Sequence, residues 1–173
     1  MLPFIAGTLI TMTGQPCPAG VISQIEGLYK WVVTPEDSRR LPIISQKDRF
    51  TPHLYQLLKG TENLSPRTDG TFVDVDPFSN TQAQVFGAKV KSCRIQQRNL
   101  VAEARVAVSY GLVNVPSGYF QTLAYRMVRV GSRWLISDIT YDILTDKPWT
   151  LTSELEDILK EVKKFHQNHT PSE

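Results

Sequence analysis

The pattern of apolar and polar positions predicts a long helix near each end of the chain. Apolar residues recur at helical spacing over 19–33, and this helix stops before Pro35, because the residue preceding a proline is pushed out of the helical region. A second apolar stripe runs through 151–166. There, Ser153 and Glu156 have the spacing of a capping box at a helix start.

A shorter helix is predicted between these two. It begins at Thr51-Pro52, with Thr51 as the cap and Pro52 at the first helical position, and it ends at Gly60. The following residues, 61–69, are polar and contain Pro66, so they predict a loop.

The middle of the chain changes to a strand pattern. Small and apolar side chains in 100–112 alternate with Glu103, Arg105 and Ser109, which is typical of a sheet with one buried and one wet face. Short turn-like connections join the strand candidates, and this favours an antiparallel meander. The four predicted strands are 86–97, 100–112, 119–130 and 133–141.

Length, composition and charge narrow the class of protein. The chain has 173 residues, of which 41% are hydrophobic and 21% charged, as expected for one globular domain with a real core. Its net charge is +2, with Lys and Arg scattered along the sequence. Nucleic-acid binding normally requires clustered basic residues, so no nucleic-acid partner is predicted.

The N-terminus bears on localisation. Residues 2–12 form an apolar stretch with the length of a signal-peptide core, too short to span a bilayer, and no Lys or Arg precedes it. We expect export to the periplasm or the exterior, or a cytoplasmic protein if this segment packs on the fold. The predicted division is an N-terminal segment 1–18, a domain 19–145, and a C-terminal helix and tail 146–173.

Cysteines and motifs predict no metal site and no cofactor. Cys17 and Cys93 are too few and too far apart for a structural zinc. They form a disulfide if the protein is exported, and two thiols fit the sequence equally well. No nucleophile elbow, phosphate-binding loop, dinucleotide fingerprint or zinc helix occurs.

The run 73–82 contains two carboxylates that can be interpreted in two ways. Asp74 and Asp76 point to the same side of an extended segment, where they could raise one another's pKa for acid–base work or hold a hard cation. The favoured interpretation is a turn, with Asp76 capping the backbone after Pro77 and Phe78 filling the core.

The last strand offers candidate catalytic and binding residues. If the sheet interior takes the face of Asp138, this carboxylate is buried with a raised pKa and is a candidate general base. If the interior takes the other face, Tyr141 lines the pocket. Arg126 on the preceding strand is the expected partner of Asp138, in an ion pair that holds an anionic ligand or is purely structural.

The order of helices, meander and final helix favours an α+β cone-shaped roll, with a strongly bent antiparallel sheet, N-terminal helices across it and a C-terminal helix. Four features carry a family resemblance: the aromatic-rich segment 28–31, the run 72–78, Gln82 and the strand 134–141. Over 19–145 the chain resembles an uncharacterised family of small, mostly exported bacterial proteins, similar to the nuclear-transport-factor-two-like superfamily with its cystatin-like cone. The resemblance implies a pocket lined by Arg126, Asp138, Tyr141, Asp76 and Gln82.

Three functions follow as hypotheses, because one fold hosts many activities. The leading one is a non-enzymatic exported module that holds a small apolar ligand or a partner protein in the cone. The second is an isomerase- or dehydratase-like enzyme, with Asp138 as base and Tyr141 or Arg126 as charge stabiliser. The third is an immunity-type inhibitor of a secreted toxin. The apolar stripe of the last helix also predicts closure of the cone or a homodimer contact.

Overall fold

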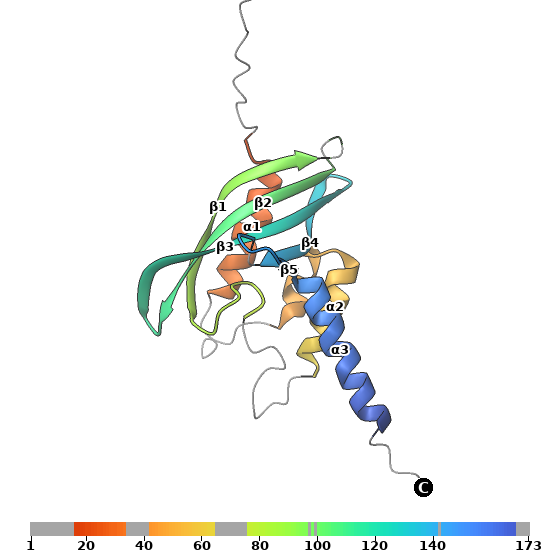
Figure 1. Ribbon diagram of the computed structural model, residues 1–173. Helices are drawn as coiled ribbons and strands as arrows, with labels where there is room; N and C mark the ends of the chain where they lie inside the picture. Colours follow the sequence, from red (N-terminus) through yellow and green to blue (C-terminus); the bar gives the residue numbers. More distant parts are fainter. Residues whose placement is uncertain are drawn as a thin grey trace, which may run out of the picture.

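The computed structural model describes residues 16–33, 42–64, 76–96, 98, 100–141 and 143–168. Over these residues the protein is α+β, with one five-stranded antiparallel sheet in the order β1-β2-β3-β4-β5 and four helices (Figure 1). The strands are β1 Gln84–Gln96, β2 Val101–Leu112, β3 Val115–Val130, β4 Arg133–Tyr141 and β5 Trp149–Thr150. The helices are α1 Ala19–Val32, the 3₁₀ helix η2 Ile43–Arg49, α2 Pro52–Glu62 and α3 Leu151–Asn168.

The four long strands lie where the sequence predicts them, except that β3 begins four residues early. Pro116 and Gly118 suggest a wide turn, but the β2–β3 connection is only residues 113–114. Asn114 permits this tight turn because it adopts φ 60°, a left-handed conformation that asparagine tolerates. Gly111 is required beside it, since a Cβ there would lie 2.6 Å from the Ser117 amide nitrogen.

Helix α2 continues past the predicted stop at Gly60 and ends at Glu62. Gly60 serves packing instead: a Cβ at this position would lie 3.2 Å from Leu159 of α3. As predicted, Thr51 is the N-cap and Pro52 follows it in the first turn, but within the described chain the Thr51 side chain makes no capping hydrogen bond. Its backbone amide donates to the Ile136 carbonyl at 2.9 Å and joins α2 to β4.

The start of α3 has a capping pair three positions earlier than predicted. Thr150 is the cap, and its Oγ1 accepts a hydrogen bond from the Ser153 amide at 3.2 Å. In return, the Thr150 amide donates to Ser153 Oγ at 3.3 Å. Two short hydroxyl side chains thus satisfy the Thr150 and Ser153 amides at the helix start, in place of the predicted pair of Ser153 and Glu156.

The core lies between α1 and one face of the sheet. Helix α1 packs on both β1 and β4, which β2 and β3 separate, so it crosses the sheet (Figure 1). Trp134 at the start of β4 is buried. Helices α2 and α3 pack on each other and on β4, and Leu151 and Leu155 of α3 belong to the same core. The sheet contributes most of the other core side chains: Val85, Ala102, Ala104, Val106, Val108, Leu123, Tyr125, Met127, Trp134, Ile136, Ile139 and Tyr141.

A disulfide joins Cys17, just before α1, to Cys93 on β1, with a Cα–Cα distance of 5.1 Å. Of the two states that the sequence leaves open, the structure therefore has the bonded one. The bridge closes a loop across a sequence separation of 76 residues and fastens the entry to α1 onto the edge strand of the sheet.

Candidate functional site

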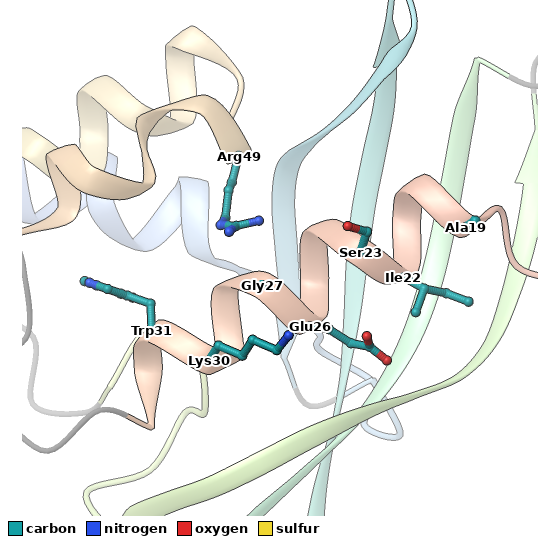
Figure 2. Close-up of a pocket in the computed structure, with 8 residues that line it drawn as sticks. All are labelled: Ala19, Ile22, Ser23, Glu26, Gly27, Lys30, Trp31 and Arg49. Atoms are coloured by element: carbon teal, nitrogen blue, oxygen red, sulfur yellow. The ribbon is translucent and has the colours of Figure 1, made fainter.

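A groove of about 640 Å³ runs along the side of α1 that faces away from the sheet (Figure 2). Helix α1 supplies most of its lining, and η2 supplies one side chain, Arg49. Ile22 and Trp31 are half-buried apolar side chains, while Glu26 and Lys30 are exposed. The full lining is Ala19, Ile22, Ser23, Glu26, Gly27, Lys30, Trp31 and Arg49.

Arg49 is held in place by neutral groups. Its Nε donates to Gln46 Oε1 at 2.7 Å, and its Nη1 donates to Gln24 Oε1 at 3.1 Å and to the Gln24 carbonyl at 3.4 Å. No carboxylate within the described ranges forms an ion pair with this guanidinium. Figure 2 shows Glu26 pointing away from it. The positive charge of Arg49 is therefore oriented but not neutralised.

Gly27 makes this placement possible. The Arg49 guanidinium lies directly against the α1 backbone, and a Cβ at position 27 would come within 2.6 Å of Arg49 Cζ. Any side chain there must push Arg49 away from the helix. The partial burial that results lowers the pKa of Arg49 from its ordinary value, because desolvation disfavours the charged form. An anion in the groove would offset that desolvation.

Arg49 and the groove were missed by the sequence analysis. The signal was present, however, in Gly27, which interrupts an otherwise regular amphipathic helix. A glycine in a helix interior costs about 1 kcal/mol relative to alanine, and this suggests that another group approaches the backbone. The sequence does not say which group, since Arg49 lies 22 positions downstream on a separate element.

Tyr141, predicted to line a pocket, belongs to a cluster of three buried tyrosines. Its hydroxyl donates to the Pro77 carbonyl, and the Tyr29 hydroxyl donates to the Phe78 carbonyl. The Tyr125 hydroxyl lies 2.9 Å from that of Tyr29, whose own proton is engaged, so Tyr125 is the donor of this pair. Burial raises the pKa of all three phenols. The cluster fills the inner side of the sheet and fastens it to the turn 76–81.

Asp76 organises that turn. Its Oδ1 accepts hydrogen bonds from the Phe78 amide at 2.8 Å and the Ser79 hydroxyl at 3.3 Å. Phe78 is buried and stacks on Phe50. This is the turn that the sequence favoured. Asp74 lies outside the described residues, and Gln82 is exposed in the bend before β1.

A bulge at Ser137 decides which side chains of β4 face inward. The pairing passes from Arg126–Asp138 to Met127–Ile136, so Ser137 is an extra residue and the alternation shifts phase. Trp134 and Ile136 before the bulge, and Ile139 and Tyr141 after it, all join the core. A regular alternation of side chains along the strand would place Ile136 and Tyr141 on opposite faces, and the sequence-based prediction used that alternation.

Asp138 therefore lies outside the core cluster and is half-buried. Its Oδ1 accepts hydrogen bonds from the Ile139 amide at 2.9 Å and from the Thr152 amide at 3.0 Å. Thr152 is in the first turn of α3, where amide groups have no helical partner and the helix dipole favours negative charge. The geometry gives Asp138 a structural task, and its role as a general base stays a prediction.

Arg126 faces Asp138 across β3 and β4, in the register that the sequence predicted. The Arg126 side chain is exposed, and no ion pair of the described chain includes it. The row continues to Glu103 on β2 and Arg94 on β1, so charges of alternating sign cross the outer face of the sheet. The five predicted site residues do not converge on one pocket: Tyr141 is inside, and Asp138 and Arg126 lie on the opposite face.

The described residues hold no group of three or more His, Cys, Asp or Glu side chains placed to bind a metal ion. Among them there is also no helix of sufficient length and apolarity to cross a bilayer. Comparison with known proteins finds no matching family model, no matching curated protein and no matching solved structure.

Proposed function

We propose that this protein is an exported, non-enzymatic interaction module that binds an acidic segment of a partner protein in the α1 groove. The element order, with α1 crossing an antiparallel sheet, supports a cone-shaped roll like that of the nuclear-transport-factor-two-like superfamily. The Cys17–Cys93 disulfide supports export, because disulfides persist in oxidising compartments.

The packing of the sheet favours a binding surface outside the cone. The inner positions hold large side chains, including Tyr125, Met127 and Tyr141, which are fully buried against the rest of the core. A small apolar ligand in this position would have to displace them. The groove along α1 lies on the outside and has a volume in the range of known ligand sites.

The single observation that carries the proposal is the state of Arg49. A guanidinium fixed by two glutamine side chains, with no carboxylate paired to it among the described residues, is pre-organised for an anion. Arginine binds carboxylates with two parallel hydrogen bonds, and Nη2 is not used by the three described bonds. Trp31 would contact apolar atoms flanking that carboxylate.

Selection from a random-peptide display library tests this function. We expect the selected peptides to share an Asp, Glu or free C-terminus next to an apolar residue, and to lose binding to Arg49→Gln. Arg133→Gln, which removes an exposed charge from β4, is the matched control and should bind as the wild type does. Selection of neutral peptides, or of peptides that bind Arg49→Gln equally well, would contradict the proposal. The toxin-inhibitor role and the homodimer stay predictions.

A further inference from the structure

The fold collects basic residues that the sequence scatters. Residues 84–130, which form β1, β2 and β3 with their turns, carry seven Lys and Arg and one Asp or Glu, a net charge of +6. The remainder of the chain carries twelve basic and sixteen acidic residues, a net charge of −4. A protein with a net charge of only +2 is thus strongly polarised, with its positive charge on the first three strands.

The strand register puts most of this charge on the outer face of the sheet. Lys89 pairs with Ala107, and Arg94 pairs with Glu103, whose row continues to Arg126. Lys89, Lys91, Arg94 and Arg126 are exposed, and none of them forms an ion pair within the described ranges. Glu103 is paired with Arg105 at 2.9 Å. Glu103 and Asp138 also lie in the row of Arg94 and Arg126, so the basic residues leave the outer face with a net positive charge.

The same face ends in an apolar tip. The β2–β3 hairpin extends beyond β4 (Figure 1), because β4 pairs with β3 only from Ala124 onward, while β1 runs beside β2 as far as Gly111. Five large apolar side chains of this tip are between 59% and 78% exposed: Leu112, Val113, Val115, Tyr119 and Phe120. A concentration of this kind in nine consecutive residues marks an interaction surface, unlike exposed apolar residues that occur singly.

The charge and the apolar tip meet at one contact. Lys91 Nζ lies 5.8 Å from the centre of the Phe120 ring, so a cation stands beside the tip on the outer face. Lys89 lies two residues before Lys91 on β1, nearer the β2–β3 turn. An anionic bilayer matches both features in this arrangement. Its acyl chains can bury the apolar tip, and its phosphate groups can bind the lysines behind the tip. Tyr119, with an apolar ring and a polar hydroxyl, is also suited to the interfacial layer between them.

We infer that the β2–β3 hairpin inserts its tip into an anionic lipid surface, with Lys89 and Lys91 contacting the head groups. The sheet is peripheral to the membrane and does not cross it. This site is distinct from the α1 groove, which lies on the other side of α1 from the sheet. The hairpin would therefore hold the protein at a membrane while leaving the groove open.

Sedimentation with vesicles tests this inference on the full chain with its disulfide intact. We expect binding to vesicles of phosphatidylcholine mixed with phosphatidylglycerol, little binding to phosphatidylcholine alone, and release by salt, which screens exposed charges. Val113→Asp should abolish binding, because it places a charge in the apolar tip. Lys89→Gln and Lys91→Gln should each weaken binding by about fivefold, the effect of one basic residue near an anionic surface.

Matched variants distinguish binding through the hairpin from nonspecific hydrophobic adsorption and from nonspecific electrostatic attraction to the vesicles. Leu144→Ser removes an apolar side chain that is 93% exposed outside the hairpin. Lys160→Gln removes an exposed charge on α3. Both should bind vesicles as the wild type does, and circular dichroism should show that every variant is folded. Equal binding by Val113→Asp would overturn the inference. Failure of the wild-type protein to bind anionic vesicles would also overturn it. The same holds if the wild-type protein binds single-stranded oligonucleotides through Lys89 and Lys91 and does not bind vesicles.

Discussion

The Asp138 carboxylate accepts a hydrogen bond from the Thr152 amide at 3.0 Å and thereby joins β4 to the first turn of α3. The interaction spans 14 residues of sequence and complements the free amide and the positive end of the helix dipole. It accounts for a carboxylate in a strand of mostly apolar residues without invoking catalysis.

Replacing Asp138 should destabilise the fold. We expect Asp138→Ala to lower the free energy of unfolding by about 1 kcal/mol, the usual cost of losing a helix-capping side chain. Asp138→Asn should lose less, because an amide oxygen can still accept the Thr152 hydrogen bond. Urea unfolding measures both. Asp157→Asn, an exposed carboxylate of α3, is the control and should leave stability nearly unchanged. An Asp138→Ala protein as stable as the wild type would refute this role.

The three buried tyrosines predict a loss of stability at alkaline pH. Burial raises the pKa of Tyr29, Tyr125 and Tyr141 above the ordinary value of 10.0, so the folded protein holds these protons when the unfolded chain releases them. The contribution of the buried phenols to the free energy of unfolding is complete below pH 10 and is lost as the pH rises above 10. Each phenol adds about 1.4 kcal/mol of destabilisation per pH unit in that range.

Tyrosinate absorbance and circular dichroism, followed together during alkaline titration, check this prediction. The three phenols should ionise only as the fold unfolds, in one cooperative step. Tyr125→Phe should make the decline of stability with pH less steep, whereas Tyr119→Phe, which alters an exposed ring, should not. Gradual ionisation of every tyrosine before unfolding would show that the cluster is not buried.

Reduction of the Cys17–Cys93 bridge should destabilise the protein strongly. Closing a loop of this length reduces the entropy of the unfolded chain by an amount worth about 4 kcal/mol. Thermal unfolding with and without a reductant measures the effect, and a Cys17→Ser and Cys93→Ser double variant should match the reduced wild type. A thiol assay on the unfolded, unreduced protein should find no free cysteine. Two reactive thiols in protein made in an oxidising compartment would contradict the bonded state.

Gly27 and Arg49 should be energetically coupled. Gly27→Ala in a helix interior normally stabilises by about 1 kcal/mol, but here the new Cβ meets the Arg49 guanidinium. We therefore expect Gly27→Ala to be neutral or destabilising in the wild type, and stabilising in an Arg49→Ala background. A double-mutant cycle of urea unfolding measures the coupling. Additive effects would mean that Arg49 does not rest on Gly27.

Much of the fold could be predicted because helix and strand periods are local properties. The segments 19–33 and 133–141 were recognisable from spacing and turn residues alone, and Asp76 was recognisable as a turn residue before Pro77. The bulge at Ser137 was not, since nothing in the sequence marks the extra residue that brings Ile136 and Tyr141 to one face.

The candidate site was harder to predict because it depends on tertiary placement. Arg49 becomes a binding residue only when η2 brings it onto Gly27, and Asp138 becomes a capping residue only when α3 returns to β4. The basic face likewise requires the register that aligns Arg94 with Arg126 across Glu103. The sequence shows which residue types are present. The contacts that give each of these residues its role form only in the folded protein.

The most direct test of the interaction-module account is a calorimetric titration with a peptide selected on the wild-type protein. The peptide and a twin in which its acidic residue is replaced by the amide are each titrated into the wild type and Arg49→Gln. We predict that either change alone weakens binding by about tenfold or more. The two changes together should weaken binding little more than either change alone, because both remove the same ion pair. Binding of the acidic peptide to Arg49→Gln with wild-type affinity would contradict the account.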